Sequence, residues 1–151
     1  MNYQPEILDE EEDDGTMPNS LETFKDLIVE HKIVKVENAQ SVPYVNKWGR
    51  NEVLDGLALT LDNGKTVYVE DTDDCCARTT LETFLLHADK IDHVITGVGT
   101  TDGFTTWHVY ADMGDVLEFE VAWTSGTPFY YGYGFDFVVL DLDGKRVEDS
   151  K

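Results

Sequence analysis

Hydrophobic and polar residues alternate along much of the second half of the chain, which is the pattern of strands with one buried face. In residues 115–124 every second residue is apolar, and Glu118 and Glu120 occupy the opposite positions. The residues expected on the packed face of this and two neighbouring strands are Trp107, Val109, Leu117, Phe119, Val121, Trp123, Phe135 and Phe137. His108 and Asp136 alternate with them. The pattern predicts an antiparallel sheet with one packed face and one wet, acidic face.

Two glycine turns divide the predicted strands. Asn63-Gly64 favours a two-residue turn with positive φ, and it separates apolar runs at 53–61 and 66–71. Asp102-Gly103 joins two further runs in the same way, at 92–101 and 104–112. The remaining strands are expected at 30–39, 115–123 and 131–141, and residues 38–52, with Pro43 and Gly49, are expected to form a loop.

Apolar residues spaced three and four positions apart predict two short helices. The first begins at Ser20, and its apolar face consists of Leu21, Phe24, Leu27 and Ile28. The second covers residues 79–88, and its buried stripe consists of Leu81, Phe84 and Leu85. Together these elements predict an α+β fold, with a mostly antiparallel sheet of about seven strands and the two short helices packed on one face.

Acidic residues dominate the chain, and their distribution suggests how it is organised. There are 31 acids against 11 bases, a formal net charge of -20, and seven of the acids fall in residues 1–14, where Lys and Arg are absent. Such a composition predicts a disordered acidic arm at residues 1–19, either solvated or partner-binding. A single α+β domain is expected at 20–144 and a polar end at 145–151.

The charge also limits the classes of partner. From Ile91 to Gly144 there are nine acids and neither Lys nor Arg. This field repels phosphate backbones and attracts basic proteins, so direct nucleic-acid binding is not expected. The chain has no run of about 18 apolar residues and no secretion signal, so we expect no membrane association and a cytoplasmic location.

Two groups of residues are predicted to bind a partner. The acidic face is expected to present Asp112, Asp115, Glu118, Glu120 and Asp136. The segment GTPFYYGYGFDF, residues 126–137, is rich in aromatic residues and glycine, and its expected exposed rings are Tyr130, Tyr131 and Tyr133. The same segment also fits a turn that leads into a strand.

The stretch EDTDDCCARTT, residues 70–80, is a weaker candidate for a functional site, because it fits a metal site poorly. The adjacent Cys75 and Cys76 lack the spacing of a zinc site. The acidic residues of the stretch could ligate calcium, but the stretch lacks the central glycine of a calcium-binding loop. The weak metal candidates are Cys75, Cys76, His87, His93 and His108, and neither a metal nor a cofactor is predicted. The stretch is interpreted as a junction between a strand and a helix, with Cys76 buried. His108 is expected to neighbour Glu118 or Glu120, either as an acid/base pair or as an ordinary ion pair.

Three stretches carry a resemblance to a known family: DGLALTLDNGKTVYVEDTDDCCA, DHVITGVGTTDGFTTWHVYAD and PFYYGYGFDF. Over about residues 22–139 the chain resembles an uncharacterised domain family of actinobacterial phages and their hosts. The Cys-Cys-Ala and Tyr-Gly-Tyr-Gly-Phe stretches are its most specific parts. The resemblance implies no activity and no catalytic residue, and it implies a phage protein made in a bacterial cytoplasm.

The sequence thus favours a non-enzymatic interaction protein whose acidic surface binds a basic host or phage protein, in its sharpest form a DNA mimic. The alternative is a virion-associated or self-assembling structural protein that uses residues 128–137 as its interface. A metal-binding or catalytic protein using the Cys/His cluster is the third hypothesis.

Overall fold

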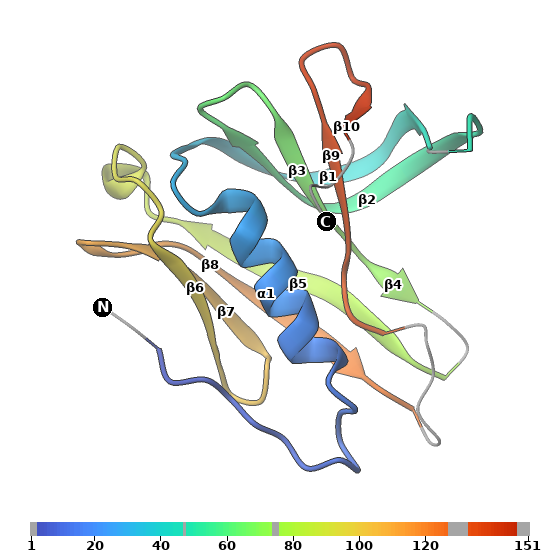
Figure 1. Ribbon diagram of the computed structural model, residues 1–151, viewed down its shortest axis with the longest axis vertical. Helices are drawn as coiled ribbons and strands as arrows, with labels where there is room; N and C mark the ends of the chain where they lie inside the picture. Colours follow the sequence, from blue (N-terminus) through green and yellow to red (C-terminus); the bar gives the residue numbers. More distant parts are fainter. Residues whose placement is uncertain (1–2, 47, 74–75, 127–132, 148–151) are drawn as a thin grey trace.

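The computed structural model describes residues 3–46, 48–73, 76–126 and 133–147. They form two five-stranded antiparallel sheets and one α-helix (Figure 1). The elements are α1 (Thr16–Ile28), β1 (Ile33–Val45), β2 (Asn51–Leu61), β3 (Thr66–Glu70), β4 (Thr72–Asp73), β5 (Arg78–Leu86), the 3-10 turn η1 (Ala88–Lys90), β6 (Gly97–Thr101), β7 (Thr106–Ala111), β8 (Gly114–Thr124), β9 (Asp136–Leu140) and β10 (Arg146–Val147).

The predicted α+β architecture is wrong. The described residues contain ten strands rather than about seven, and one α-helix rather than two. The first sheet has the order β1-β2-β3-β9-β10, and the second sheet has the order β4-β5-β8-β7-β6. The predicted loop at 38–52 is also mostly strand, because β1 runs to Val45 and β2 starts at Asn51.

The predicted hairpins are present. β2 pairs with β3 around the Asn63-Gly64 turn, and β6 pairs with β7 around Asp102-Gly103. Gly64 and Gly103 both have positive φ, which these turns require. The residues of the two turns were therefore enough to predict both hairpins correctly.

Residues 79–88, predicted as a helix, form β5 and the turn after it. β5 pairs with β8 along its length, and the register shifts at Glu82, where one extra residue makes a β-bulge. Leu81 packs against the core before the bulge, and Phe84 and Leu86 pack against it afterwards. The bulge lengthens one inward step from two residues to three, so the strand imitates the spacing of a helix.

The core lies between the two sheets and is closed by α1, which crosses in front of the second sheet in Figure 1 and contacts β3 and β9 of the first. Phe24 of α1 is fully buried, and its ring stacks on Phe137 of the first sheet at 5.7 Å between centroids. The same ring meets the edge of Phe119, in the second sheet, at 5.9 Å. One aromatic residue thus joins the helix to both sheets, and aromatic burial of this kind supplies much of a core's stability.

α1 begins at Thr16, before the predicted start at Ser20 and inside the range predicted as a disordered arm. Asp13 is buried and accepts hydrogen bonds from the backbone N–H groups of Gly15 and Met17, both at 3.2 Å, which satisfies donors at the helix start. The residues before the helix, 3–15, are called the N-terminal segment below. The 13-residue helix is too short and too polar to cross a membrane, and the described residues contain no other α-helix.

Candidate functional site

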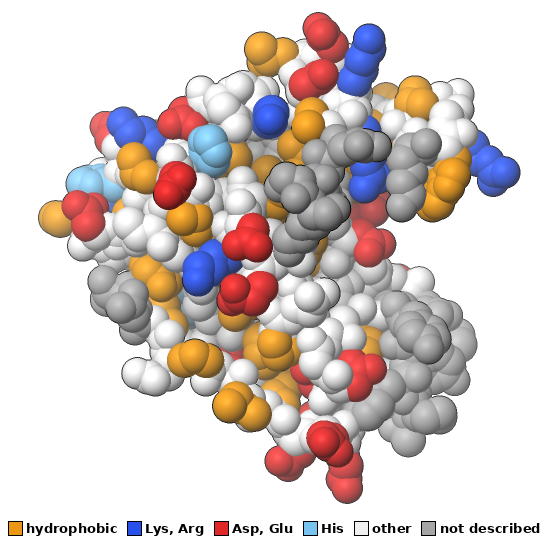
Figure 2. Space-filling view, viewed as in Figure 1, with side chains coloured by type: hydrophobic (Ala, Val, Ile, Leu, Met, Phe, Trp, Pro, Cys, Tyr) orange, Lys and Arg blue, Asp and Glu red, His pale blue; other side chains and the backbone are white. Residues whose placement is uncertain are grey.

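An open cavity of about 440 Å³ lies beside β9, between α1 and the end of the β1–β2 pair. Its wall includes the rings of Tyr44 and Trp48, the carboxylates of Glu52, Glu70 and Asp136, and Arg146. Figure 2 shows the molecule hollowed on the right of this face, with acidic side chains in the hollow. Aromatic rings and carboxylates together form a lining that suits a cationic group.

Two of these carboxylates lie directly opposite each other. Glu70 of β3 and Asp136 of β9 are partners in the antiparallel ladder, and like charges in that arrangement oppose pairing. Burial, followed by the charges of Asp136 and Glu52, raises the pKa of Glu70 from 4.5 to about 7. Burial also raises the pKa of Asp136, and Arg146 offsets part of this rise. The cavity therefore concentrates negative charge that its own residues neutralise only in part.

The loop between β1 and β2 positions the outer wall of the cavity. Asn46 accepts hydrogen bonds from the backbone N–H groups of Trp48 and Arg50, both at 2.9 Å, and donates to Glu52 at 2.5 Å. The Tyr44 hydroxyl donates to the other oxygen of Glu52 at 3.1 Å. The indole of Trp48 is 73 % exposed at the rim. The buried Asn46 thus holds both an aromatic residue, Trp48, and an acidic residue, Glu52, in position at the opening of the cavity.

The five predicted acidic-face residues lie on both sheets. Asp136 belongs to the first sheet, and the other four lie on β8 of the second sheet or in the turn before it. Glu120 is exposed, and Asp112 is 73 % exposed and pairs with His93 at 3.0 Å. Asp115 and Glu118 are less exposed because they belong to a histidine cluster.

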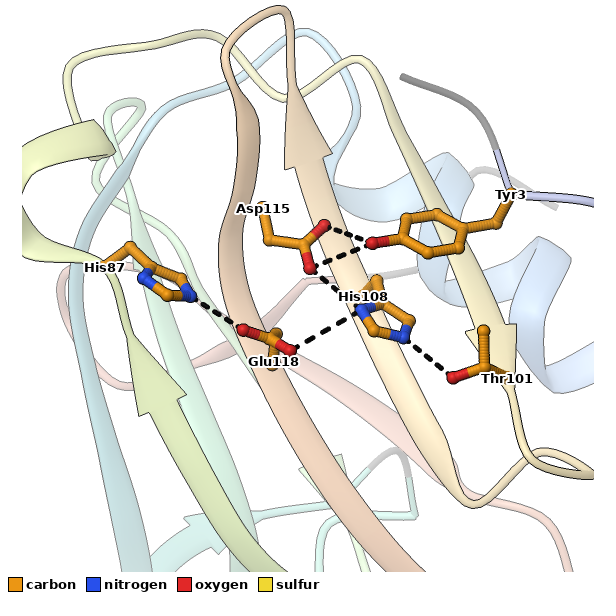
Figure 3. Close-up of polar contacts among 6 residues, drawn as sticks. All are labelled: Tyr3, His87, Thr101, His108, Asp115 and Glu118. Atoms are coloured by element: carbon orange, nitrogen blue, oxygen red, sulfur yellow. Dashed lines mark hydrogen bonds and ion pairs between the residues drawn. The ribbon is translucent and has the colours of Figure 1, made fainter.

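His108 is the centre of that cluster (Figure 3). Its Nδ1 lies 2.9 Å from Asp115 Oδ2 and 3.8 Å from Glu118 Oε1. Its Nε2 lies 2.9 Å from the Thr101 hydroxyl. The other oxygen of Glu118 lies 2.7 Å from His87 Nε2. The sequence predicted that His108 would neighbour Glu118 or Glu120, and Glu118 is the neighbour.

A second β-bulge makes the cluster possible. Asp115 and Glu118 are three residues apart, and regular alternation would place them on opposite faces of β8. At one point in the ladder, the next paired residue is one position further along β7 but two positions further along β8. Val116 is therefore an extra residue in β8. Val116 and Leu117 are both fully buried, and the acids on either side of them reach the same outer face.

The N-terminal segment covers this outer face. The Tyr3 ring stacks on His108 at 4.2 Å, and its hydroxyl donates to both oxygens of Asp115, at 2.8 and 2.9 Å. Gly99 permits this, because a Cβ there would collide with Tyr3. Burial and the bond to Asp115 raise the pKa of the Tyr3 hydroxyl, so it remains a donor. Three residues further on, Glu6 accepts the N–H groups of Gly103 and Phe104 at 2.7 and 2.9 Å.

The remaining predicted site residues do not gather at one place. Cys76 is exposed rather than buried, since no helix starts after it, and Cys75 lies outside the described residues. Tyr133 was expected to be exposed and is 4 % exposed; its ring stacks on Trp123 and its hydroxyl donates to Asp13 at 2.9 Å. Tyr130 and Tyr131 lie outside the described residues.

Sequence reasoning missed Tyr3 and Thr101 in the histidine cluster, and Glu52 and Glu70 in the cavity. Glu70 was considered only as one of the acids of the 70–80 stretch, which lacks the central glycine of a calcium loop. No local motif marks these positions, because each reaches its site through pairing between distant segments. Alternation within the strands was the only available signal, and it did place His108 beside an acid.

Comparison with family models matches residues 11–137 to the family described as Domain of unknown function (DUF7448). Comparisons with curated proteins and with solved structures give no match. The match starts at residue 11, so it includes part of the acidic segment that lay outside the resemblance expected for 22–139. The prediction of a family without an assigned function is confirmed, whereas its phage or actinobacterial origin stays a prediction. Since the match covers most of the chain, the protein belongs to the DUF7448 family.

Proposed function

We propose that the protein is a non-enzymatic binding protein that recognises a basic protein partner, and that the acidic cavity receives a Lys or Arg side chain of that partner. The observation that carries the proposal is the direct opposition of Glu70 and Asp136 inside an aromatic-walled cavity. A cation between these carboxylates would relieve their repulsion. The rings of Tyr44 and Trp48 would add cation–π contact.

The charge outside the cavity supports the same partner class. Six side-chain ion pairs occur among the described residues, and five of them use a histidine; only the exposed pair of Lys35 and Glu37 uses a lysine. Most acids in the described part of the chain therefore form no ion pair with Lys or Arg, and they would steer a basic protein toward the surface.

The placement of the acids favours a basic protein surface over a literal copy of DNA as the basis of recognition. Asp136 lies on one sheet and Glu118 and Glu120 lie on the other, so these residues do not form one row of phosphate-like charges. A host or phage origin of the partner, and a cytoplasmic or virion location, remain part of the proposal. Half of the alternative interface at 128–137, residues 128–132, lies outside the described residues.

Binding of a short arginine-rich peptide, measured by calorimetry at low salt and pH 8, where Glu70 is ionised, tests the proposal. Asp136→Asn and Glu70→Gln should each weaken binding about 5- to 30-fold, the effect of losing a partly desolvated charge contact of about 1–2 kcal/mol. Arg146→Gln should strengthen binding, because it removes a competing cation from the cavity wall.

Glu22→Gln is the matched control, because it removes one exposed charge of α1 outside the cavity. It should change the affinity less than about twofold, as expected for a solvent-screened charge outside the cavity. If Glu22→Gln weakens binding as much as Asp136→Asn does, the peptide responds to net charge alone and the cavity is not the site.

A further inference from the structure

The histidine cluster on the second sheet supports an inference independent of the cavity. His108, Asp115 and Glu118 each aim one potential ligand atom at a common point, and the three atoms lie within 4.8 Å of one another. We propose that these three side chains form a binding site for one divalent first-row transition-metal ion, such as Zn²⁺ or Co²⁺.

The distances fit such an ion after small movements. Metal–nitrogen and metal–oxygen bonds of about 2.0–2.2 Å place two donors of a tetrahedral ion roughly 3.4 Å apart. The Nδ1 of His108 is 2.9 Å from Asp115 and 3.8 Å from Glu118. Both distances differ from this spacing by roughly half an ångström, which is within the freedom of carboxylate side chains. The three donor atoms all lie within 4.8 Å of one another.

The charge also fits. Two carboxylates face one imidazole, and a divalent ion would balance their two negative charges. The side chains of His108 and Asp115 are 10 % and 15 % exposed, so water screens the site poorly and a counter-charge is worth more there than at the open surface.

The surrounding contacts resemble the outer shell of a metal centre. With Nδ1 on the ion, the Nε2–H of His108 would donate to the Thr101 hydroxyl 2.9 Å away, which fixes the ring and its tautomer. Tyr3 holds Asp115, and His87 holds the second oxygen of Glu118. Hydrogen bonds of this kind orient ligands before the ion arrives.

The donor set determines the class of ion. One imidazole nitrogen with two carboxylates suits Zn²⁺, Co²⁺, Mn²⁺ or Fe²⁺. Ca²⁺ takes six to eight oxygen ligands, and Mg²⁺ retains its waters and prefers oxygen, so both should bind much more weakly. The site thus differs from the predicted cysteine–histidine cluster, since it uses His108 with two carboxylates and neither cysteine nor His93.

Calorimetry on the untagged full chain, stripped of metal with EDTA and dialysed, tests the proposal with Zn²⁺, Co²⁺ and Ca²⁺ as probes. Zn²⁺ and Co²⁺ should bind with a stoichiometry of one and far more tightly than Ca²⁺. Asp115→Asn and Glu118→Gln should each weaken Zn²⁺ binding at least ~100-fold, because each removes a ligand. Far-UV circular dichroism without metal confirms that each variant is folded.

His93→Gln is the matched control, because His93 and Asp112 form an exposed pair at 3.0 Å, and no third donor joins them among the described residues. It should leave Zn²⁺ binding unchanged. In nuclear magnetic resonance spectra Zn²⁺ should shift the Nδ1 signal of His108 and not those of His31 or His93. Equal affinity for Ca²⁺, wild-type affinity in both carboxylate variants, or loss of binding in His93→Gln would each overturn the assignment.

Discussion

At the scale of single residues, Glu70 connects the cavity with the stability of the fold. Its pKa is raised from 4.5 to about 7, first by burial and then by the neighbouring acids. The folded chain therefore keeps this proton at pH values where the unfolded chain has released it. Between about pH 4.5 and 7 the folded state binds more protons, so the free energy of unfolding falls as the pH rises.

Glu70→Gln should remove this contribution. We expect the stability of the variant relative to the unsubstituted protein to rise by about 1–2 kcal/mol between about pH 5 and pH 8, after allowance for solvent screening. Urea unfolding at both pH values measures it. Glu22→Gln, an exposed substitution on α1, should show little change. A relative stability of Glu70→Gln that does not depend on pH would contradict the raised pKa.

At the scale of elements, β5 distinguishes the predicted helix from the observed strand. A helix would bury Leu85 with Leu81 and Phe84, whereas the strand leaves Leu85 57 % exposed and packs Leu86 against the core. Leu86→Ala should therefore cost about 1.5–2.5 kcal/mol of unfolding free energy, and Leu85→Ala less than about 0.5 kcal/mol. Chemical denaturation measures both, and a larger cost for Leu85→Ala would contradict the strand assignment.

The hairpins and the bulges show how far the sequence could predict the structure. The hairpins at Asn63-Gly64 and Asp102-Gly103 were predictable because turn chemistry is local. The bulges at Glu82 and Val116 were not, because each is defined by the pairing of its strand with a neighbour. The bulge at Glu82 led to the wrong prediction of a helix at residues 79–88.

The same limit applies to the candidate sites. The sequence named His108, Asp115 and Glu118, yet it did not combine them into one site. The contribution of Tyr3 could not be predicted, because Tyr3 forms its hydrogen bond with Asp115, which is 112 residues away in the chain. Glu70 and Asp136 likewise face each other only because β3 pairs with β9, two strands separated by the whole second sheet.

At the scale of the whole molecule, the net charge of -20 opposes compaction. Salt screens this repulsion, and the Debye length falls from about 30 Å at 0.01 M to about 6 Å at 0.3 M. We expect the midpoint of thermal unfolding to rise when NaCl increases over that range, as measured by circular dichroism. A fall would show that attractive ion pairs outweigh the repulsion.

The bulge at Val116 also bears on how such a protein can change over generations. Asp115 and Glu118 are three residues apart, and the extra residue Val116 brings both to the outer face of β8. Deletion of the Val116 codon would leave these two acids two residues apart, so regular alternation would still place both on the outer face. The three-donor cluster would therefore survive loss of the bulge among relatives, and substitution of a donor residue would remove it.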